Sequence, residues 1–266
     1  LAPDVPPVHL NLARALVDAG APEQAEAALA AAAARFPDDE HFPLELFALH
    51  KRQGRDEAAL AALERAATLR PHDASLQVDL GREYLPHLRM ADAEAAFRRA
   101  IALDASNADA HMGLAVVFEH DQPDRLDALA EEAARNRVDP PYQRLLRAYA
   151  LRRARRFEEA VAELVAVPDS IEPIHRSDVL GQCLDRLGRS DEAFAAFQQM
   201  NQALAEDPSR PLERAAELRR RVAFERDLLD PAWAGEWAQF ELPQPDRTPV
   251  FLVGFLAAGV ALDTGT

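Results

Sequence analysis

The stretch LGREYLPHLRMADAEAAFRRA, residues 80–100, decides the fold. It places Leu80, Gly81 and Tyr84 ahead of a short turn, and then Ala93 and Phe97 one helical turn apart. Small and large apolar residues at helical spacing on both sides of a turn are typical of two helices that pack closely against each other. We therefore predict a helix–turn–helix unit over this stretch.

The same pattern recurs at intervals of 34 residues. Ala25, Ala59 and Ala93 form one column, and Leu29, Leu63 and Phe97 form another in the same register. Self-similarity at this period is typical of helical hairpins that stack into an array. The sequence predicts an array over residues 1–207, with units at about 6–39, 40–73, 74–107, 108–140, 141–173 and 174–207.

The third unit, Leu80-Gly81-x-x-Tyr84 followed by Ala93-x-x-x-Phe97, resembles the tetratricopeptide repeat (TPR). The resemblance implies an all-α fold, a right-handed superhelix of about six repeats followed by a C-terminal helix and an apolar tail. An unrelated helical-hairpin repeat is the alternative. Small residues would let paired helices approach closely, and glycines would end the first helix of a unit. The small residues are Ala13, Gly81, Ala115, Ala148 and Gly181, and the glycines are Gly20, Gly54 and Gly188.

Two units depart from the pattern. Phe47 occupies the small-residue position of the second unit, so we expect that unit to open slightly. In the fourth unit Asp127 stands where an alanine is expected, with Ala128 one residue late, and Glu131 replaces the large apolar residue.

The chain beyond the repeats divides into three predicted segments: a capping helix over 208–229, a linker over 230–248 and an apolar segment over 249–266. Residues 248–255, TPVFLVGF, resemble the first strand of the sulfotransferase domain in bacterial proteins that carry TPR units ahead of that domain. In that family the next loop binds the sulfate donor PAPS. Gly254 and Gly259 match this loop, but its hydroxyls and arginine are missing, so we predict no cofactor. A generic apolar segment that docks on the repeats or joins two copies as a homodimer is the alternative.

Composition excludes several classes of protein. The net charge of −15 argues against general nucleic-acid binding, because the phosphate backbone would repel the chain. The single cysteine, Cys183, rules out an intrachain disulfide, and we interpret it as a buried filler. The longest apolar run, 250–262, is shorter than the roughly 20 residues that a membrane-spanning helix needs. We expect a cytoplasmic protein without a signal segment.

The predicted functional surface is the inner groove formed by the first helices. No metal-ligand spacing is found among the histidines and no catalytic set is found, so we predict neither a metal site nor an enzyme. The groove positions that we single out are Arg14, Lys51, Arg82, Tyr142, Tyr149 and Arg152. The fifth unit concentrates basic residues, namely Arg144, Arg147, Arg152, Arg153, Arg155 and Arg156.

These residues suggest a scaffold that binds a protein partner through an acidic or tyrosine-containing peptide, and that recruits substrate for a sulfotransferase-type protein. Two alternatives stay open, an active PAPS-dependent sulfotransferase and a structural assembly factor. A solvated helix face is the alternative interpretation of the basic cluster.

Overall fold

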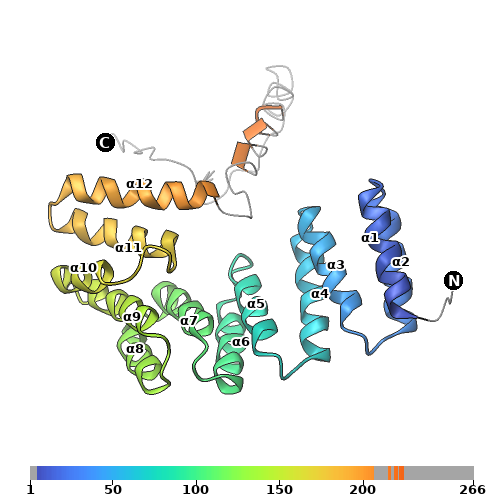
Figure 1. Ribbon diagram of the computed structural model, residues 1–266, viewed down its shortest axis with the longest axis horizontal. Helices are drawn as coiled ribbons and strands as arrows, with labels where there is room; N and C mark the ends of the chain where they lie inside the picture. Colours follow the sequence, from blue (N-terminus) through green and yellow to red (C-terminus); the bar gives the residue numbers. More distant parts are fainter. Residues whose placement is uncertain (1–4, 207–214, 217–218, 221, 225–266) are drawn as a thin grey trace, which may run out of the picture. The chain divides into compact units, whose positions relative to one another are not determined.

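The computed structural model describes residues 5–206, 215–216, 219–220 and 222–224 (Figure 1). The chain separates into two compact units, Leu1–Pro208 and Ser209–Thr266. The described residues of the second unit are helical and belong to the predicted capping helix. The predicted linker 230–248 and apolar segment 249–266 lie outside the described residues.

Six helical hairpins follow one another in the first unit. Their pairs are α1 (Pro6–Asp18) with α2 (Pro22–Arg35), α3 (His41–Arg52) with α4 (Asp56–Leu69), α5 (Ala74–Tyr84) with α6 (Met90–Leu103), α7 (Ala108–Asp121) with α8 (Leu126–Arg135), α9 (Pro140–Arg153) with α10 (Phe157–Val165), and α11 (Pro173–Arg186) with α12 (Ser190–Glu206). A short 3₁₀ helix, η1 (Pro123–Arg125), precedes α8. No strand occurs over residues 5–206, so the all-α prediction is confirmed there.

Helix ends follow the local sequence. Asp73 accepts a hydrogen bond from the Leu76 N–H at 3.1 Å and so caps α5, and Asn107 caps α7 through the Ala110 N–H at 2.8 Å. Gly20 and Gly54 follow the first helices of their units in left-handed backbone, at φ +74° and +68°. Glycine adopts this conformation without the steric penalty of a side chain.

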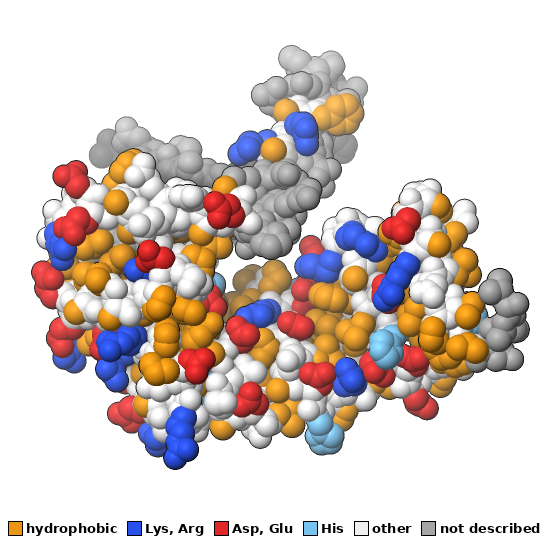
Figure 2. All heavy atoms as spheres, viewed as in Figure 1, with side chains coloured by type: hydrophobic (Ala, Val, Ile, Leu, Met, Phe, Trp, Pro, Cys, Tyr) orange, Lys and Arg blue, Asp and Glu red, His pale blue; other side chains and the backbone are white. Residues whose placement is uncertain are grey.

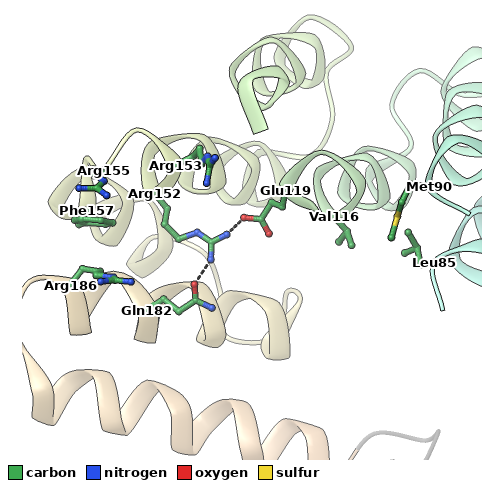
Figure 3. A pocket seen from close by; sticks show the side chains of 10 residues that line it. All are labelled: Leu85, Met90, Val116, Glu119, Arg152, Arg153, Arg155, Phe157, Gln182 and Arg186. Carbon is green, nitrogen blue, oxygen red and sulfur yellow. Dashed lines mark hydrogen bonds and ion pairs between the residues drawn. The ribbon is translucent and has the colours of Figure 1, made fainter. Parts of the chain in front are cut away.

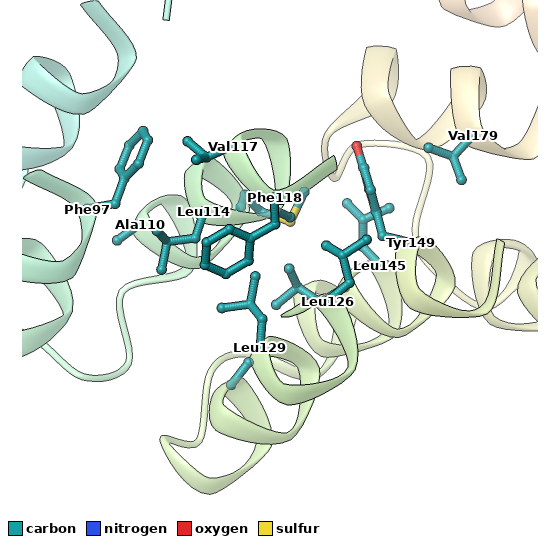
Figure 4. Packing of buried hydrophobic residues seen from close by; sticks show 14 of the residues in the cluster. Phe97, Ala110, Leu114, Val117, Phe118, Leu126, Leu129, Leu145, Tyr149 and Val179 are labelled. Carbon is teal, nitrogen blue, oxygen red and sulfur yellow. The ribbon is translucent and has the colours of Figure 1, made fainter. Parts of the chain in front are cut away.

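The predicted apolar columns form the core. Ala25, Ala59, Ala93 and Phe97 are each fully buried, and Leu29 is nearly so. Figure 4 shows the same kind of packing around Phe118, between α7, α8 and α9. These contacts hold each first helix against its own second helix and against the next hairpin.

The core divides within the second hairpin. One buried cluster joins Ala13, Ala25 and Phe42, and a larger one runs from Leu60 to Ala196. Phe47, at the small-residue position, is only partly buried and packs against the larger cluster. The expectation that a large residue there opens the second unit stays a prediction.

The fourth hairpin corrects the predicted register. Leu126, Leu129 and Ala133 are the buried residues of α8, whereas Asp127 is exposed. The apolar face therefore begins one residue before the expected alanine position, because η1 occupies the turn ahead of α8. The fold absorbs the irregular sequence by shortening this unit, and Ala128 is not its core alanine.

No helix among the described residues is long and apolar enough to cross a membrane.

Candidate functional site

The predicted groove cations form a ladder of ion pairs between successive first helices. Each pair joins the first helix of one hairpin to that of the next. The pairs are Arg14–Glu45, Lys51–Glu83, Arg82–Asp109 and Arg152–Glu119. Basic and acidic side chains therefore alternate over the face shown in Figure 2, and neither kind forms a continuous patch there.

This ladder changes what the groove cations can do. Lys51 donates to Glu83 at 2.9 Å and to Asp56 at 3.0 Å, and Glu83 keeps only 11% of its side chain exposed. Burial alone would lower the pKa of Lys51, but these two hydrogen bonds raise it overall. The cation is therefore already partnered, and an incoming carboxylate would have to compete with Glu83 for it.

The two predicted groove tyrosines lie at different depths. Tyr149 is 2% exposed and belongs to the core, with the Arg152 guanidinium 5.4 Å from its ring centroid. Burial raises the pKa of its hydroxyl. Tyr142 is partly buried, and burial raises its pKa as well. Tyr149 thus supports the groove floor beneath Arg152, which corrects its assignment to the groove surface.

A pocket of about 680 Å³ opens where four first helices meet (Figure 3). Helices α7, α9 and α11 contribute to it, together with Leu85 directly after α5, Arg155 in the turn before α10, and the starts of α6 and α10. Its lining residues are Leu85, Met90, Val116, Glu119, Arg152, Arg153, Arg155, Phe157, Gln182 and Arg186. Of the six groove residues chosen from the sequence, Arg152 alone lines this pocket.

Arg152 spans the middle of the pocket. Its guanidinium makes an ion pair with Glu119 of α7 and donates to the side-chain oxygen of Gln182 on α11. In Figure 3 this bridge stands between two groups of side chains. We call Leu85, Met90 and Val116 the apolar wall, and Arg153, Arg155 and Arg186 the arginine wall.

The arginine wall has no acidic partner among the residues that the structure describes. The side chains of Arg153, Arg155 and Arg186 make no ion pair or hydrogen bond with any residue over the described ranges. All three are exposed, and in Figure 3 Phe157 lies between Arg155 and Arg186. The wall therefore presents positive charge that no residue in the described part of the chain matches.

The rest of the basic cluster of the fifth hairpin is paired with acidic residues. Arg144 and Arg147 both donate to Glu163, at 2.8 and 3.0 Å, and Arg156 donates to Glu159 at 2.7 Å. These residues line a different pocket, between α8, α9 and α10. These arginines therefore differ from the arginine wall, because acidic residues of their own hairpin pair with them.

The repeat register also places Leu85, Val116, Glu119 and Gln182 along the groove, but sequence reasoning missed the other three pocket residues: Met90, Phe157 and Arg186. The first two begin the second helices of their hairpins, at a position that Pro22, Asp56 and Ser190 occupy in the first, second and sixth. The sequence alone shows that a large apolar residue at this position departs from the repeat. Arg186 had no such signal, because basic residues commonly end helices.

A second departure falls in the same two hairpins. The turn position that holds Gly20, Gly54 and Gly188 elsewhere holds Leu88 and Arg155 here, at φ +57° and +59°. A side chain in left-handed backbone costs about 1 kcal/mol or more relative to glycine. Strained positions of this kind cluster at functional sites. Arg155 is therefore held at the pocket against a local conformational cost.

Other candidate chemistry is modest. Among the described residues, Asp39, Glu40 and His41 are the group whose ligand atoms come within 4.8 Å of one another. His41 Nδ1 already contacts Asp39 at 2.7 Å, and Glu40 pairs with Arg70 at 3.3 Å. Cys183 is buried, and burial raises its pKa to about 11, so the thiol stays protonated at neutral pH.

Comparison with known proteins agrees with the repeat. Two family models described as tetratricopeptide repeat match, one over residues 1–42 and one over 78–124. Together with the six hairpins they confirm the prediction of a TPR solenoid. Neither match reaches the sulfotransferase-like residues, which also lie outside the described ranges, and Gly254 and Gly259 stay a prediction. No curated protein matches.

Solved structures share the fold. The pilus biogenesis factor PilW is 15% identical with a TM-score of 0.51, covering 77% of this chain and 96% of its own. PilF of Pseudomonas aeruginosa is 15% identical with a TM-score of 0.51, covering 79% and 97%. A tetratricopeptide repeat protein from Parabacteroides merdae is 15% identical with a TM-score of 0.52, covering 76% and 79%. At these identities the likeness concerns architecture.

Proposed function

We propose that this chain, a TPR solenoid, is a protein–protein interaction scaffold whose groove binds an acidic peptide segment of a partner. The observation that carries the proposal is the arginine wall: Arg153, Arg155 and Arg186 lack acidic partners over the described residues of a chain with net charge −15. Arginine clusters bind carboxylates through charge-assisted hydrogen bonds. Dissolved salt screens such bonds less in a concave surface than on a flat one.

The construction of the pocket favours a polypeptide over a small molecule. Four successive hairpins contribute to its lining, and stacked repeats generally provide extended surfaces for partners. Most of the lining side chains are charged or polar, whereas pockets for small ligands are mainly apolar. An extended segment can contact several hairpins at once, which a compact ligand cannot do.

The same pocket gives little basis for catalysis. Glu119 is its one carboxylate, and Arg152 holds that carboxylate in an ion pair. An ion-paired carboxylate is a poor general base, because the pair stabilises its ionised form.

A tyrosine-containing partner, the other expectation from the sequence, would place its ring against the apolar wall or Phe157.

A display selection tests the proposal. Random twelve-residue peptides would be selected on the parent protein, and their affinities then measured on two variants that lose equal charge. The pocket variant is Arg155→Gly with Arg186→Ser. The control variant is Arg137→Gly with Arg99→Ser, which removes another left-handed arginine, at φ +57°, and another exposed helical arginine, both outside the pocket.

We expect the selected peptides to be rich in Asp and Glu. We also expect them to bind the pocket variant on the order of tenfold more weakly than the control variant, since each lost charge-assisted contact contributes about 1 kcal/mol or more. Selected peptides that bind both variants equally, or a selection with no acidic enrichment, would contradict the proposal.

A further inference from the structure

The pocket has two chemically different ends. Leu85, Met90 and Val116 of the apolar wall are each only partly buried, so apolar surface remains open to the cavity. Arg155 and Arg186 of the arginine wall lie across the Arg152 bridge from them, and Arg153 lies beside the bridge (Figure 3). Open apolar surface next to open charge calls for a ligand that supplies both an apolar group and an anion.

The bridge determines where the anion binds. Arg152 already has Glu119 and Gln182 as partners, so an added carboxylate at this point would meet the negative charge of Glu119. Arg153, Arg155 and Arg186 have no such competitor within the described residues. Acidic groups of a ligand are therefore directed past the bridge to the arginine wall.

Both ends depend on the hairpins that depart from the repeat. Met90 and Phe157 begin α6 and α10 with a large apolar residue, and Arg155 takes the turn position where glycine would be unstrained. Two independent departures, one apolar and one charged, meet at one cavity. Met90 and Phe157 also pack against the core cluster, yet the first, second and sixth hairpins form with Pro22, Asp56 and Ser190 at this position.

We infer that the pocket takes a peptide segment that carries an apolar side chain and acidic side chains on one strand. The apolar side chain docks on Leu85, Met90 and Val116, and the acidic side chains pair with the arginine wall. This inference rests on the proposed function and adds the second chemical element of the partner. Arg155 contributes to the preference for acidic side chains, because it places a charge at a turn position where glycine would be unstrained but uncharged.

Fluorescein-labelled synthetic peptides test the two-part ligand by fluorescence anisotropy. The series contains three glutamates in a Gly/Ser background, one leucine in the same background, and both elements together with the leucine on either side of the glutamates. The proteins are the parent, the pocket variant and the control variant defined above, Met90→Gln for the apolar wall, and Met200→Gln on α12 as its control outside the pocket.

One of the combined peptides should bind at least about fivefold more tightly than the glutamate peptide, which is the gain expected from partly burying a leucine. Met90→Gln should abolish that gain, and Met200→Gln should preserve it. If both combined peptides bind no better than the glutamate peptide, the inference fails while the proposed function stands. If no peptide distinguishes the pocket variant from the control variant defined above, the proposed function fails as well.

Discussion

Phe97 of α6 fills the space that a side chain on Gly81 of α5 would need. A Cβ atom at Gly81 would lie 2.6 Å from Cε1 of Phe97, and a Cβ atom at Gly113 of α7 would also meet this ring. One aromatic ring therefore lies against two glycines, from its own hairpin and from the next. The small-residue position of the repeat is thus a steric requirement within the hairpin, and Gly113 adds a second close approach to the same ring from the next hairpin.

Substitution of Gly81 by alanine should destabilise the array by about 1–3 kcal/mol, because Phe97 is fully buried and cannot move aside. Urea denaturation followed by circular dichroism measures the change. Gly81→Ala combined with Phe97→Leu should recover part of the loss, since the smaller side chain vacates the contested space.

Gly20→Ala provides the contrast. A Cβ atom at Gly20 would meet nothing within 4 Å, so its cost, about 1 kcal/mol, comes from backbone at φ +74°. No change in the neighbouring side chains should rescue it. A Gly81→Ala protein as stable as the parent would show that the ring packs elsewhere.

Arg176 supports the end of the fifth hairpin from within. It is 6% exposed, and its Nε donates to the carbonyls of Leu164 at 3.1 Å and Val167 at 3.0 Å. Arg176→Met should lower the free energy of unfolding by about 2–4 kcal/mol, because the carbonyls at the end of α10 would lose a charged donor inside the protein.

The matched control is Arg99→Met, on an exposed arginine of α6. It should change the stability by less than about 0.5 kcal/mol. Thermal and urea unfolding of the two variants side by side would decide the matter. Equal losses would mean that charge removal, rather than the carbonyl contacts, governs the effect.

His111 gives the array a pH dependence. Its ring is fully buried, Nδ1 donates to the Asn107 carbonyl at 2.8 Å, and Nε2 has no hydrogen-bond partner within the described residues. Burial lowers the pKa of His111 below its ordinary value of 6.5, despite the opposing effect of the Asn107 hydrogen bond. Below that value the unfolded chain binds a proton that the folded chain resists, so stability falls as the pH falls through and below 6.5.

His111→Leu should reduce this acid sensitivity. From about pH 7.5 to about pH 5.5, the urea midpoint of the parent should fall more than that of the variant. His175, whose pKa the Glu172 hydrogen bond raises, contributes in the opposite direction but equally in both proteins. Parallel pH profiles for parent and variant would refute the assignment to His111.

The sequence predicted the repeat well because the repeat follows from packing. Columns such as Ala25, Ala59 and Ala93 must be small wherever helices cross, so periodicity alone reveals them. It located the hairpins of the irregular fourth unit but misplaced the core residues of α8, because nothing local marked η1 as the turn. Tertiary context shifted the apolar face by one residue to Leu126.

The candidate site was harder to predict because it depends on pairs between hairpins. Arg82 and Arg153 look alike in the sequence, yet Asp109 neutralises the first at 2.7 Å and no described residue neutralises the second. The partner residues come from a different hairpin, and the sequence alone does not show which acids lie within reach. Departures from the repeat, at Met90 and Arg155, were the signals that could have indicated the site.

The most direct test of the central claim uses the methionine methyl groups. The chain has three methionines: Met90 in the apolar wall, Met112 in the core and Met200 on α12. In protein labelled with ¹³C at the methionine methyls, the tightest-binding peptide of the series described above would be titrated while the three signals are followed. We predict that the Met90 signal shifts saturably and that the Met200 signal stays in place. A saturable shift at Met200 with an unmoved Met90 would place the binding site outside the pocket and contradict the account.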